Sequence, residues 1–177
     1  MPKFENNETL FLKEDHKILF ELYNSWKSYD KLLRKFKTRG SNIPEPLTEG
    51  LVCYLFGYKR TGGKTGDGIN REGKIMEAKS TSIKNDCTSF SPKKPYWNRI
   101  YFLDFYNSGS EGQFKIYDLS DIDFDNLNIS KKQTFKNQRE QGRRPRFSIR
   151  SEVINKNNIS PKLDLSLKNI AKHFTAF

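Results

Sequence analysis

Large apolar residues recur every three or four positions between about Asp15 and Lys37, which predicts an amphipathic helix. Asp15 is a suitable N-cap for this helix, and Gly40 is a suitable stop. After a loop with two prolines, residues from about Leu47 to Tyr58 are apolar on most sides and predict a second, buried helix. The apolar positions of the first helix are Ile18, Leu19, Leu22, Tyr23, Trp26, Leu32, Leu33 and Phe36.

The pattern changes to that of strands after a glycine-rich stretch, KRTGGKTGDG, which we expect to be a loop. In a phosphate-binding loop the helix follows the glycine-rich stretch, whereas here a helix precedes it, so we do not interpret it as a nucleotide site. A strand from about Asp67, a turn at REG and a strand from about Lys74 to Thr81 predict a β-hairpin.

Two aromatic-rich segments, Arg99–Asn107 and Gly112–Leu119, predict further strands. We expect their aromatic residues to lie in the core and not to form a platform for stacking bases. These elements predict an α/β fold with a mixed β-sheet core flanked by helices. The aromatic residues concerned are Tyr101, Phe102, Phe105 and Tyr106.

The chain becomes strongly basic and poor in large apolar residues beyond Leu119. We expect a helix at about Lys131–Glu140 that ends at Gly142, then a basic extended piece around Pro145 and another short helix. The simplest domain organisation is a single domain over residues 1–177. Its first part, to about residue 119, holds the helices and the sheet, and its second part, about 120–177, is a basic segment.

Composition favours a polyanionic partner. The 177 residues include 32 Lys and Arg against 21 Asp and Glu, a formal net charge of +11, so nucleic acid is the leading candidate. A well-solvated basic surface is the alternative. No apolar run approaches the roughly 20 residues that cross a bilayer, so we expect no membrane association. Cys53 and Cys87 stand apart without a CxxC motif, which favours reduced thiols in a cytoplasmic protein.

The predicted hairpin carries the candidate chemistry. Glu77 and Lys79 are two residues apart on a strand and therefore share a face. The turn at REG folds the preceding strand back, so Asp67 can lie beside Glu77. Two such carboxylates suit Mg²⁺, and Lys79 can hold an attacking water. Glu49, in the first turn of the second helix, could supply a further carboxylate through water. The alternative is that these charges form the solvated face of a strand.

The order of Glu49, GDGI with Asp67, and EAK with Glu77 and Lys79 resembles the PD-(D/E)xK nuclease superfamily over about residues 47–82. The superfamily has a mixed sheet flanked by helices and includes most type II restriction endonucleases. Gly66 stands where the motif has proline. This resemblance implies metal ligands at Asp67 and Glu77 and catalytic roles for Asp67, Glu77, Lys79 and Glu49.

A narrower resemblance extends over most of the chain. The segments TSFSP, YFLDFYNSG and QTFKNQREQGRRPRFSI, with the aromatic first helix, are similar to a small family of type II restriction enzymes that cut GCNGC. The resemblance implies a homodimeric, Mg²⁺-dependent endonuclease of double-stranded DNA in the prokaryotic cytoplasm, working beside a separate methyltransferase. The alternatives are a DNA-binding protein without catalysis, or a nuclease of the same fold with another target, such as a resolvase or a repair nuclease.

The segment NQREQGRRPRF is the candidate for reading the DNA sequence. Arginine bidentate to guanine is the commonest specific base contact, and a GC-rich target favours arginines. A strip that only holds phosphates is the alternative. We expect Lys84, Lys93 and Lys94 to contact phosphates or to face solvent. The candidate DNA-binding residues are Gln138, Arg139, Gln141, Arg143, Arg144 and Arg146.

Overall fold

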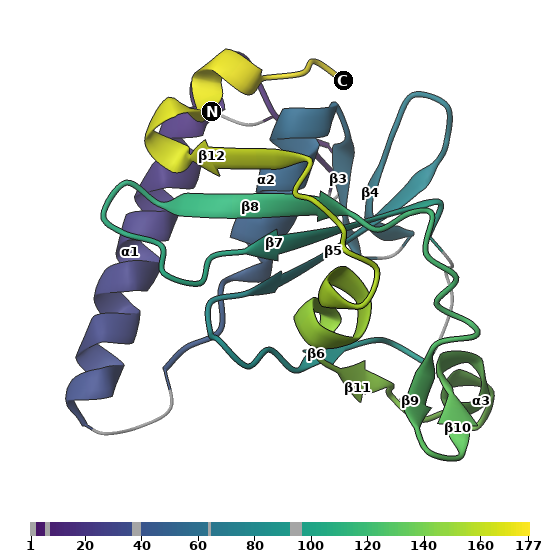
Figure 1. Cartoon of the computed structure of the whole chain (residues 1–177). Helices are drawn as coiled ribbons and strands as arrows, with labels where there is room; N and C mark the ends of the chain where they lie inside the picture. The colour runs from purple at the N-terminus through teal and green to yellow at the C-terminus, as the bar shows by residue number, and fades with distance from the viewer. Residues whose placement is uncertain (1–2, 6–7, 37–39, 64, 93–96) are drawn as a thin grey trace.

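A mixed eight-stranded β-sheet forms the centre of the computed structural model (Figure 1). The structure describes residues 3–5, 8–36, 40–63, 65–92 and 97–177. Strands β5 and β7 run parallel, and the other neighbouring strands are antiparallel. In spatial order the strands are β1 (Lys3–Glu5), β2 (Glu8–Leu10), β3 (Lys59–Gly63), β4 (Gly66–Ile69), β5 (Ile75–Thr81), β7 (Arg99–Asp104), β8 (Gln113–Asp118) and β12 (Leu163–Ser166).

Two helices cover one face of this sheet, and both were expected. Helix α1 spans His16–Lys35 after a short 3-10 turn, η1 (Lys13–Asp15), and α2 spans Glu45–Phe56. Their apolar sides pack with Met76 and Ala78 of β5 and with Tyr101 and Leu103 of β7. The C-terminal turn η3 (Leu167–His173) completes this core. Among the described residues, no helix is long and apolar enough to cross a membrane.

The other face of the sheet carries a second, mainly aromatic core. Strand β7 serves both cores, because Ile100 and Phe102 point to the face opposite Tyr101 and Leu103. Phe90 is the centre of the second core, and its ring stacks on that of Phe147 with centroids 5.3 Å apart. The remaining buried members are Leu119, Phe124, Phe135, Ile149, Val153 and Ile154.

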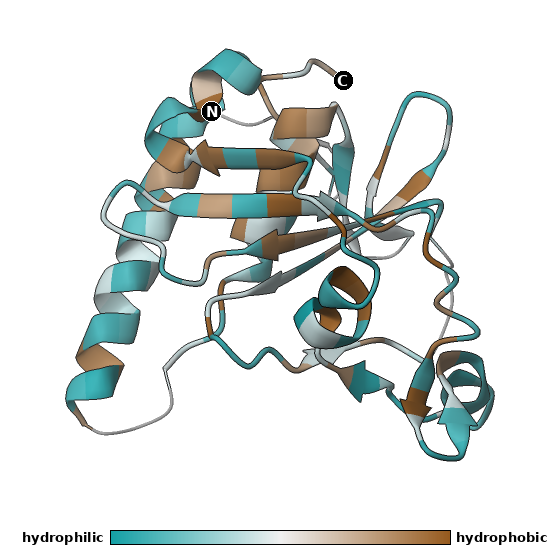
Figure 2. Cartoon of the chain, viewed as in Figure 1, coloured by the Kyte–Doolittle hydropathy of each residue, from teal (hydrophilic) through white to brown (hydrophobic). Residues whose placement is uncertain are grey.

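Most of this second core comes from residues 120–162, which we call the arm (Figure 1). The arm leaves the sheet after β8 and returns to it at β12. Polar and apolar residues alternate along the arm (Figure 2), and its large apolar side chains are buried in the second core. It contains β9 (Asn128–Ser130), β10 (Gln133–Thr134), α3 (Phe135–Glu140), β11 (Arg146–Phe147) and the π-helical turn η2 (Arg150–Asn155).

Polar contacts fasten the arm to the sheet. Strand β11 pairs with β6 (Thr88–Ser89), and the Phe90 amide donates to the Pro145 carbonyl at 3.0 Å. The Arg150 guanidinium donates to both carboxylate oxygens of Asp104, at 2.7 and 3.0 Å. Buried Asp86 accepts from the Ser148 hydroxyl at 2.6 Å and the Ile149 amide at 2.7 Å. Bidentate arginine–carboxylate pairs fix orientation, so the arm has a defined position on the sheet.

Three local expectations differ from the structure. The glycine-rich stretch is not a loop, because β3 begins at Lys59 and pairs with β4, with a register irregularity between Arg60 and Gly63. Tyr106 is 42% exposed beyond the end of β7, whereas Tyr101, Phe102 and Phe105 are buried as expected. The helix expected from Lys131 begins only at Phe135, because residues 128–134 form the β9–β10 hairpin.

Candidate active site

The β4–β5 hairpin brings Asp67 and Glu77 together. The register pairs Gly68 with Met76 and Ile69 with Ile75. Continuing that antiparallel register places Asp67 across from Glu77, and opposed side chains on antiparallel strands share a face. The Asp67 carboxylate also accepts the Ala78 amide at 2.8 Å. The expected neighbourhood of the two carboxylates is therefore present.

Glycine before Asp67 has a physical reason. Gly66 has a φ of +92°, and a Cβ atom there would lie 2.4 Å from the Ile75 side chain. A proline, whose ring holds φ near −65°, cannot adopt this conformation. The departure from the PD-(D/E)xK pattern therefore follows from the tight β3–β4 connection, which presents Asp67 to β5.

Lys79 lies beside Glu77, with 2.5 Å between its Nζ atom and the Glu77 Oε1 atom. Its ammonium group also stands over the Phe90 ring, 5.5 Å from the centroid. Burial acts to lower the pKa of Lys79, but the charges of Glu77 and Asp67 outweigh it and raise that pKa. Lys79 is therefore held as a cation between the carboxylates of the hairpin and the aromatic core under the arm.

Glu49 of α2 faces the same place, but it already has a partner. Arg60 of β3 donates its Nε–H to Glu49 Oε2 at 2.5 Å. A cavity of about 160 Å³ is lined by both residues together with Asp67 and Lys79. Burial raises the pKa of Glu49, and Arg60 opposes that rise. Glu49 is thus close enough to act on the site, and Arg60 holds its orientation.

The carboxyl group of Asp67 has the most perturbed pKa among these acids. Burial, followed by the negative charges of Glu77 and Glu49, raises it to about 7. The Ala78 amide and Lys79 oppose this rise but do not cancel it. Such crowding of buried carboxylates is typical of functional sites, because a bound cation removes the repulsion.

The donor set fits Mg²⁺. Among the described residues, no three His, Cys, Asp or Glu side chains are placed to enclose a metal ion. Mg²⁺ does not require such a cage, because it keeps several waters and is commonly bound by one or two carboxylates. Asp67 and Glu77 are two opposed carboxylates whose mutual repulsion a divalent cation would relieve. The hairpin could therefore hold the ion with water completing its coordination.

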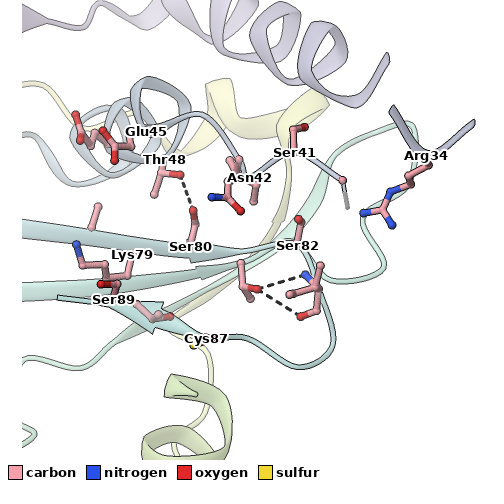
Figure 3. Close-up of a pocket in the computed structure, with 17 residues that line it drawn as sticks. Arg34, Ser41, Asn42, Glu45, Thr48, Lys79, Ser80, Ser82, Cys87 and Ser89 are labelled. Carbon is pink, nitrogen blue, oxygen red and sulfur yellow. Dashed lines mark hydrogen bonds between the residues drawn. The ribbon is translucent and has the colours of Figure 1, made fainter. Parts of the chain in front are cut away.

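A polar groove of about 470 Å³ leads away from this site. It runs between the end of α1, the start of α2 and the ends of β5 and β6, and Lys79 lies at one end of it (Figure 3). Thr48 and Ser80 share a hydrogen bond of 2.8 Å across its wall. Hydroxyl and amide groups dominate the lining, which includes Ser41, Asn42, Thr48, Ser80, Thr81, Ser82, Thr88 and Ser89.

The arm places one of its arginines next to this groove. Arg146 is paired with Ser89, and Ser89 lines the groove. Arg143, Arg144 and Arg146 are all exposed. Among the candidate amides, Gln138 and Gln141 both hydrogen bond to Gln133, at 3.3 and 3.1 Å. Of the exposed arginines, Arg146 is thus the one that this pairing places beside the groove.

Arg139 differs from the other candidates, because it is only 6% exposed. Its guanidinium lies over the rings of Trp97 and Phe135, 5.7 and 5.6 Å from their centroids. In this conformation it belongs to the packing of the arm and does not face a duplex. Lys84 is exposed as expected, and Lys93 and Lys94 lie outside the described residues.

The sequence did not lead us to predict two polar residues of the site. Glu45 lines both cavities with Lys79, and Arg60 orients Glu49. Glu45 precedes Glu49 by four residues, so the helical spacing could have revealed that both lie on one face. Arg60 had no such signal, because its strand was expected to be a loop.

Comparisons with known proteins agree with this geometry. Residues 11–156 match the sequence family described as Bsp6I restriction endonuclease. The chain is 36% identical over 156 residues to the type II restriction enzyme Bsp6I of Bacillus sp. (strain RFL6). That similarity covers 85% of this chain and 88% of the relative. No solved structure matches the chain.

Proposed function

Since this chain belongs to the Bsp6I restriction endonuclease family, and is a type II restriction endonuclease, we propose that it cuts double-stranded DNA at GCNGC with Mg²⁺ held by Asp67 and Glu77. The observation that most strongly supports this proposal is the hairpin on which these carboxylates face each other with Lys79 beside them. The groove that begins at Lys79 supports a path for the strand to be cut.

Each side chain has a distinct part in the reaction. Mg²⁺, when bound, supplies Lewis-acid stabilisation of the scissile phosphate and a more acidic water. Asp67 and Glu77 bind the ion, and the Ala78 amide keeps the Asp67 carboxylate oriented. Lys79 holds the attacking water and neutralises the charge that develops on the phosphate. Glu49, oriented by Arg60, acts on the site through water.

Sequence reading belongs to the exposed arginines of the arm. Arg143, Arg144 and Arg146 are free to approach the major groove, where arginine pairs with guanine O6 and N7. Gln138 and Gln141 support the same segment through Gln133. Lys84 contacts phosphate. The four guanines that both strands of a GCNGC site offer suit this arginine content.

The enzyme works as a homodimer in the cytoplasm of a prokaryote, beside a methyltransferase of the same specificity. A palindromic site has two-fold symmetry, and a dimer with a two-fold axis matches it. The methyltransferase protects the host site by modification, so the two proteins need not bind each other.

Plasmid digestion tests this proposal. The purified protein should give discrete fragments with Mg²⁺ or Mn²⁺, and Ca²⁺ should support binding without turnover, because its looser coordination positions water poorly. Sequencing the fragment ends should place every cut within GCNGC. Cleavage that persists in excess EDTA contradicts the carboxylate–metal assignment. A mobility shift without fragments in any metal means that the chain only binds DNA.

A further inference from the structure

Helix α1 exposes a row of large apolar side chains on a flank next to the face that packs on the sheet. Of the six exposed large hydrophobic residues that the structure describes, four belong to α1 or its C-cap. Their exposed fractions are 42% for Ile18, 56% for Tyr29, 54% for Leu32 and 78% for Phe36. Single exposed apolar residues are common, but a continuous row marks an interaction surface.

The spacing of this row is that of a helix-pairing seam. Together with half-buried Leu22 and exposed Ser25, the residues are separated by four, three, four, three and four positions. That 3-4 repeat lines one face of a helix and is the pattern of a helix that pairs with another helix. From Ile18 to Phe36 the seam is about 27 Å long at 1.5 Å per residue. The seam is Ile18, Leu22, Ser25, Tyr29, Leu32 and Phe36.

Most of the seam is not used by the core, and only half-buried Leu22 packs against its edge. Helix α1 buries Leu19, Tyr23 and Trp26 against the sheet, and these residues lie on a different side of the helix. In Figure 1 the C-terminal half of α1 runs past the edge of the strands. A helix with one buried face and a second exposed apolar face has room for a partner helix.

We propose that the seam pairs with α1 of a second copy, antiparallel, to form the dimer of this enzyme. Positions equidistant from residue 27 then face each other. Ile18 meets the partner's Phe36, Leu22 meets the partner's Leu32, and Ser25 meets the partner's Tyr29. The small Ser25 opposite the large Tyr29 matches side-chain volumes near the middle of the seam. The pattern is self-complementary, as an interface with a two-fold axis requires.

Charge complementarity supports the same arrangement. Glu21 and Lys35 are exposed on the solvent side of the seam, each seven residues from Ser28. In the antiparallel pair Glu21 faces the partner's Lys35, and the symmetry repeats the contact. Within the described residues neither side chain has an ion-pair partner in its own chain. A parallel pair would instead bring like charges to the same height along the two helices.

This dimer suits the palindromic target of the proposed function. The inference that the partner is a second copy rests in part on that proposal. Arg34, in the last turn of α1, lines the groove that begins at Lys79. Pairing through α1 therefore places the grooves of both protomers next to the two-fold axis. Each active site can then act on one strand of the same duplex.

Sedimentation equilibrium of the free protein tests the seam, without DNA or metal. The wild type should be a dimer at about 10 µM, and Leu32→Glu or Tyr29→Glu should weaken dimerisation by about a hundredfold or more. Asn24→Glu is the control, because Asn24 is exposed on α1 away from the seam. Helical circular dichroism equal to that of the wild type shows that the variants fold.

Charge exchange tests the antiparallel register. Glu21→Lys and Lys35→Glu should each weaken the dimer about tenfold, because two attractive pairs become repulsive. The double variant should recover wild-type affinity. Mixing the two single variants should give a heterodimer in preference to either homodimer, since both of its pairs are attractive. Equal weakening in the double variant overturns the register.

The proposed dimer and the proposed function can be contradicted separately. A wild type that cuts plasmid but is monomeric, free and on DNA, overturns this dimer and leaves the nuclease intact. A dimer that persists in Leu32→Glu overturns the seam as well, since another surface then pairs. A dimer that responds to the seam variants but cuts no DNA supports the interface and contradicts the proposed function.

Discussion

The β4–β5 hairpin and the arm carry complementary parts of the proposed reaction, but their structures have different origins. The hairpin is local, since Asp67, Glu77 and Lys79 lie within thirteen residues and one turn brings them together. The arm is held by long-range contacts, including β11 on β6 and Arg150 on Asp104. In the proposed reaction, chemistry thus depends on a local unit, whereas recognition depends on a segment positioned by the rest of the molecule.

The clearest way to separate the two regions is to abolish cleavage while DNA binding is kept. Asp67→Asn, Glu77→Gln or Lys79→Met should lower the cleavage rate by roughly a thousandfold or more, because each removes a metal ligand or the group that holds water. Affinity for cognate DNA in Ca²⁺ should change little for Lys79→Met. Rates come from single-turnover plasmid cleavage.

Asp164→Asn is the matched control, since Asp164 is an exposed carboxylate of β12 paired with Lys115. It should cut like the wild type. Strong residual cleavage by Glu77→Gln would mean that the hairpin does not hold the metal.

The converse change removes recognition of the DNA sequence and keeps the cleavage site intact. Arg143→Ala or Arg144→Ala should lower the ratio of cognate to random DNA binding by about a hundredfold, because an arginine bidentate to guanine contributes about 1–3 kcal/mol and a dimer loses two. The assay is competition between cognate and scrambled duplexes in Ca²⁺ at fixed salt.

Lys136→Ala, an exposed cation of α3, is the control for loss of charge in the arm. It should weaken both duplexes alike and lower the salt slope by about one. An unchanged ratio in both arginine variants places recognition outside the arm.

Crowding of the carboxylates predicts a pH-dependent stability of the metal-free protein. Folding raises the pKa of Asp67 to about 7, above its unfolded value. The folded state therefore retains a proton that the unfolded state has lost, and this contribution to stability disappears as pH rises through 7. Asp67→Asn, which keeps the acceptor for the Ala78 amide, should stabilise the protein at pH 8 by on the order of 2 kcal/mol.

Urea unfolding in EDTA at pH 5 and pH 8 measures this difference. The advantage of Asp67→Asn should shrink at pH 5, where Asp67 of the folded wild type is protonated. Mg²⁺ at pH 8 should stabilise the wild type more than Asp67→Asn. If the free energies of unfolding of Asp67→Asn and the wild type differ equally at both pH values, the raised pKa of Asp67 is contradicted.

The smallest expected effect concerns Phe90, which lies where the hairpin and the arm meet. Phe90 contacts both, because its ring stacks on Phe147 of the arm and lies under the Lys79 ammonium. Phe90→Leu should lower kcat about tenfold with little change in KM, since it leaves Lys79 less well placed while the arm still binds DNA.

Phe124→Leu is the matched control. Phe124 belongs to the same aromatic core and touches Phe90, whereas the ring under the Lys79 ammonium is that of Phe90. Both variants lose ring packing, so their thermal stabilities should fall together while only Phe90→Leu loses kcat. Equal losses of kcat would indicate that the core acts only through stability.

Local sequence was sufficient to predict the elements that carry the candidate catalytic residues. Helical spacing located α1 and α2 to within a few residues, and alternation with a turn at REG located the β4–β5 hairpin. The positions of Asp67, Glu77 and Lys79 follow from that hairpin, because strand geometry fixes which side chains share a face. Even the glycine in place of proline was visible, although its reason, the positive φ of Gly66, was not.

Tertiary structure decided the rest. Arg139 looks like its exposed neighbours in sequence, yet packing on Trp97 and Phe135 buries it. The glycine-rich stretch forms β3 only because β4 is there to pair with it, and β12 returns to the sheet from far along the chain. Hydrophobic periodicity reports contacts within one element, whereas these features depend on pairings between residues distant in sequence. No local pattern records those pairings.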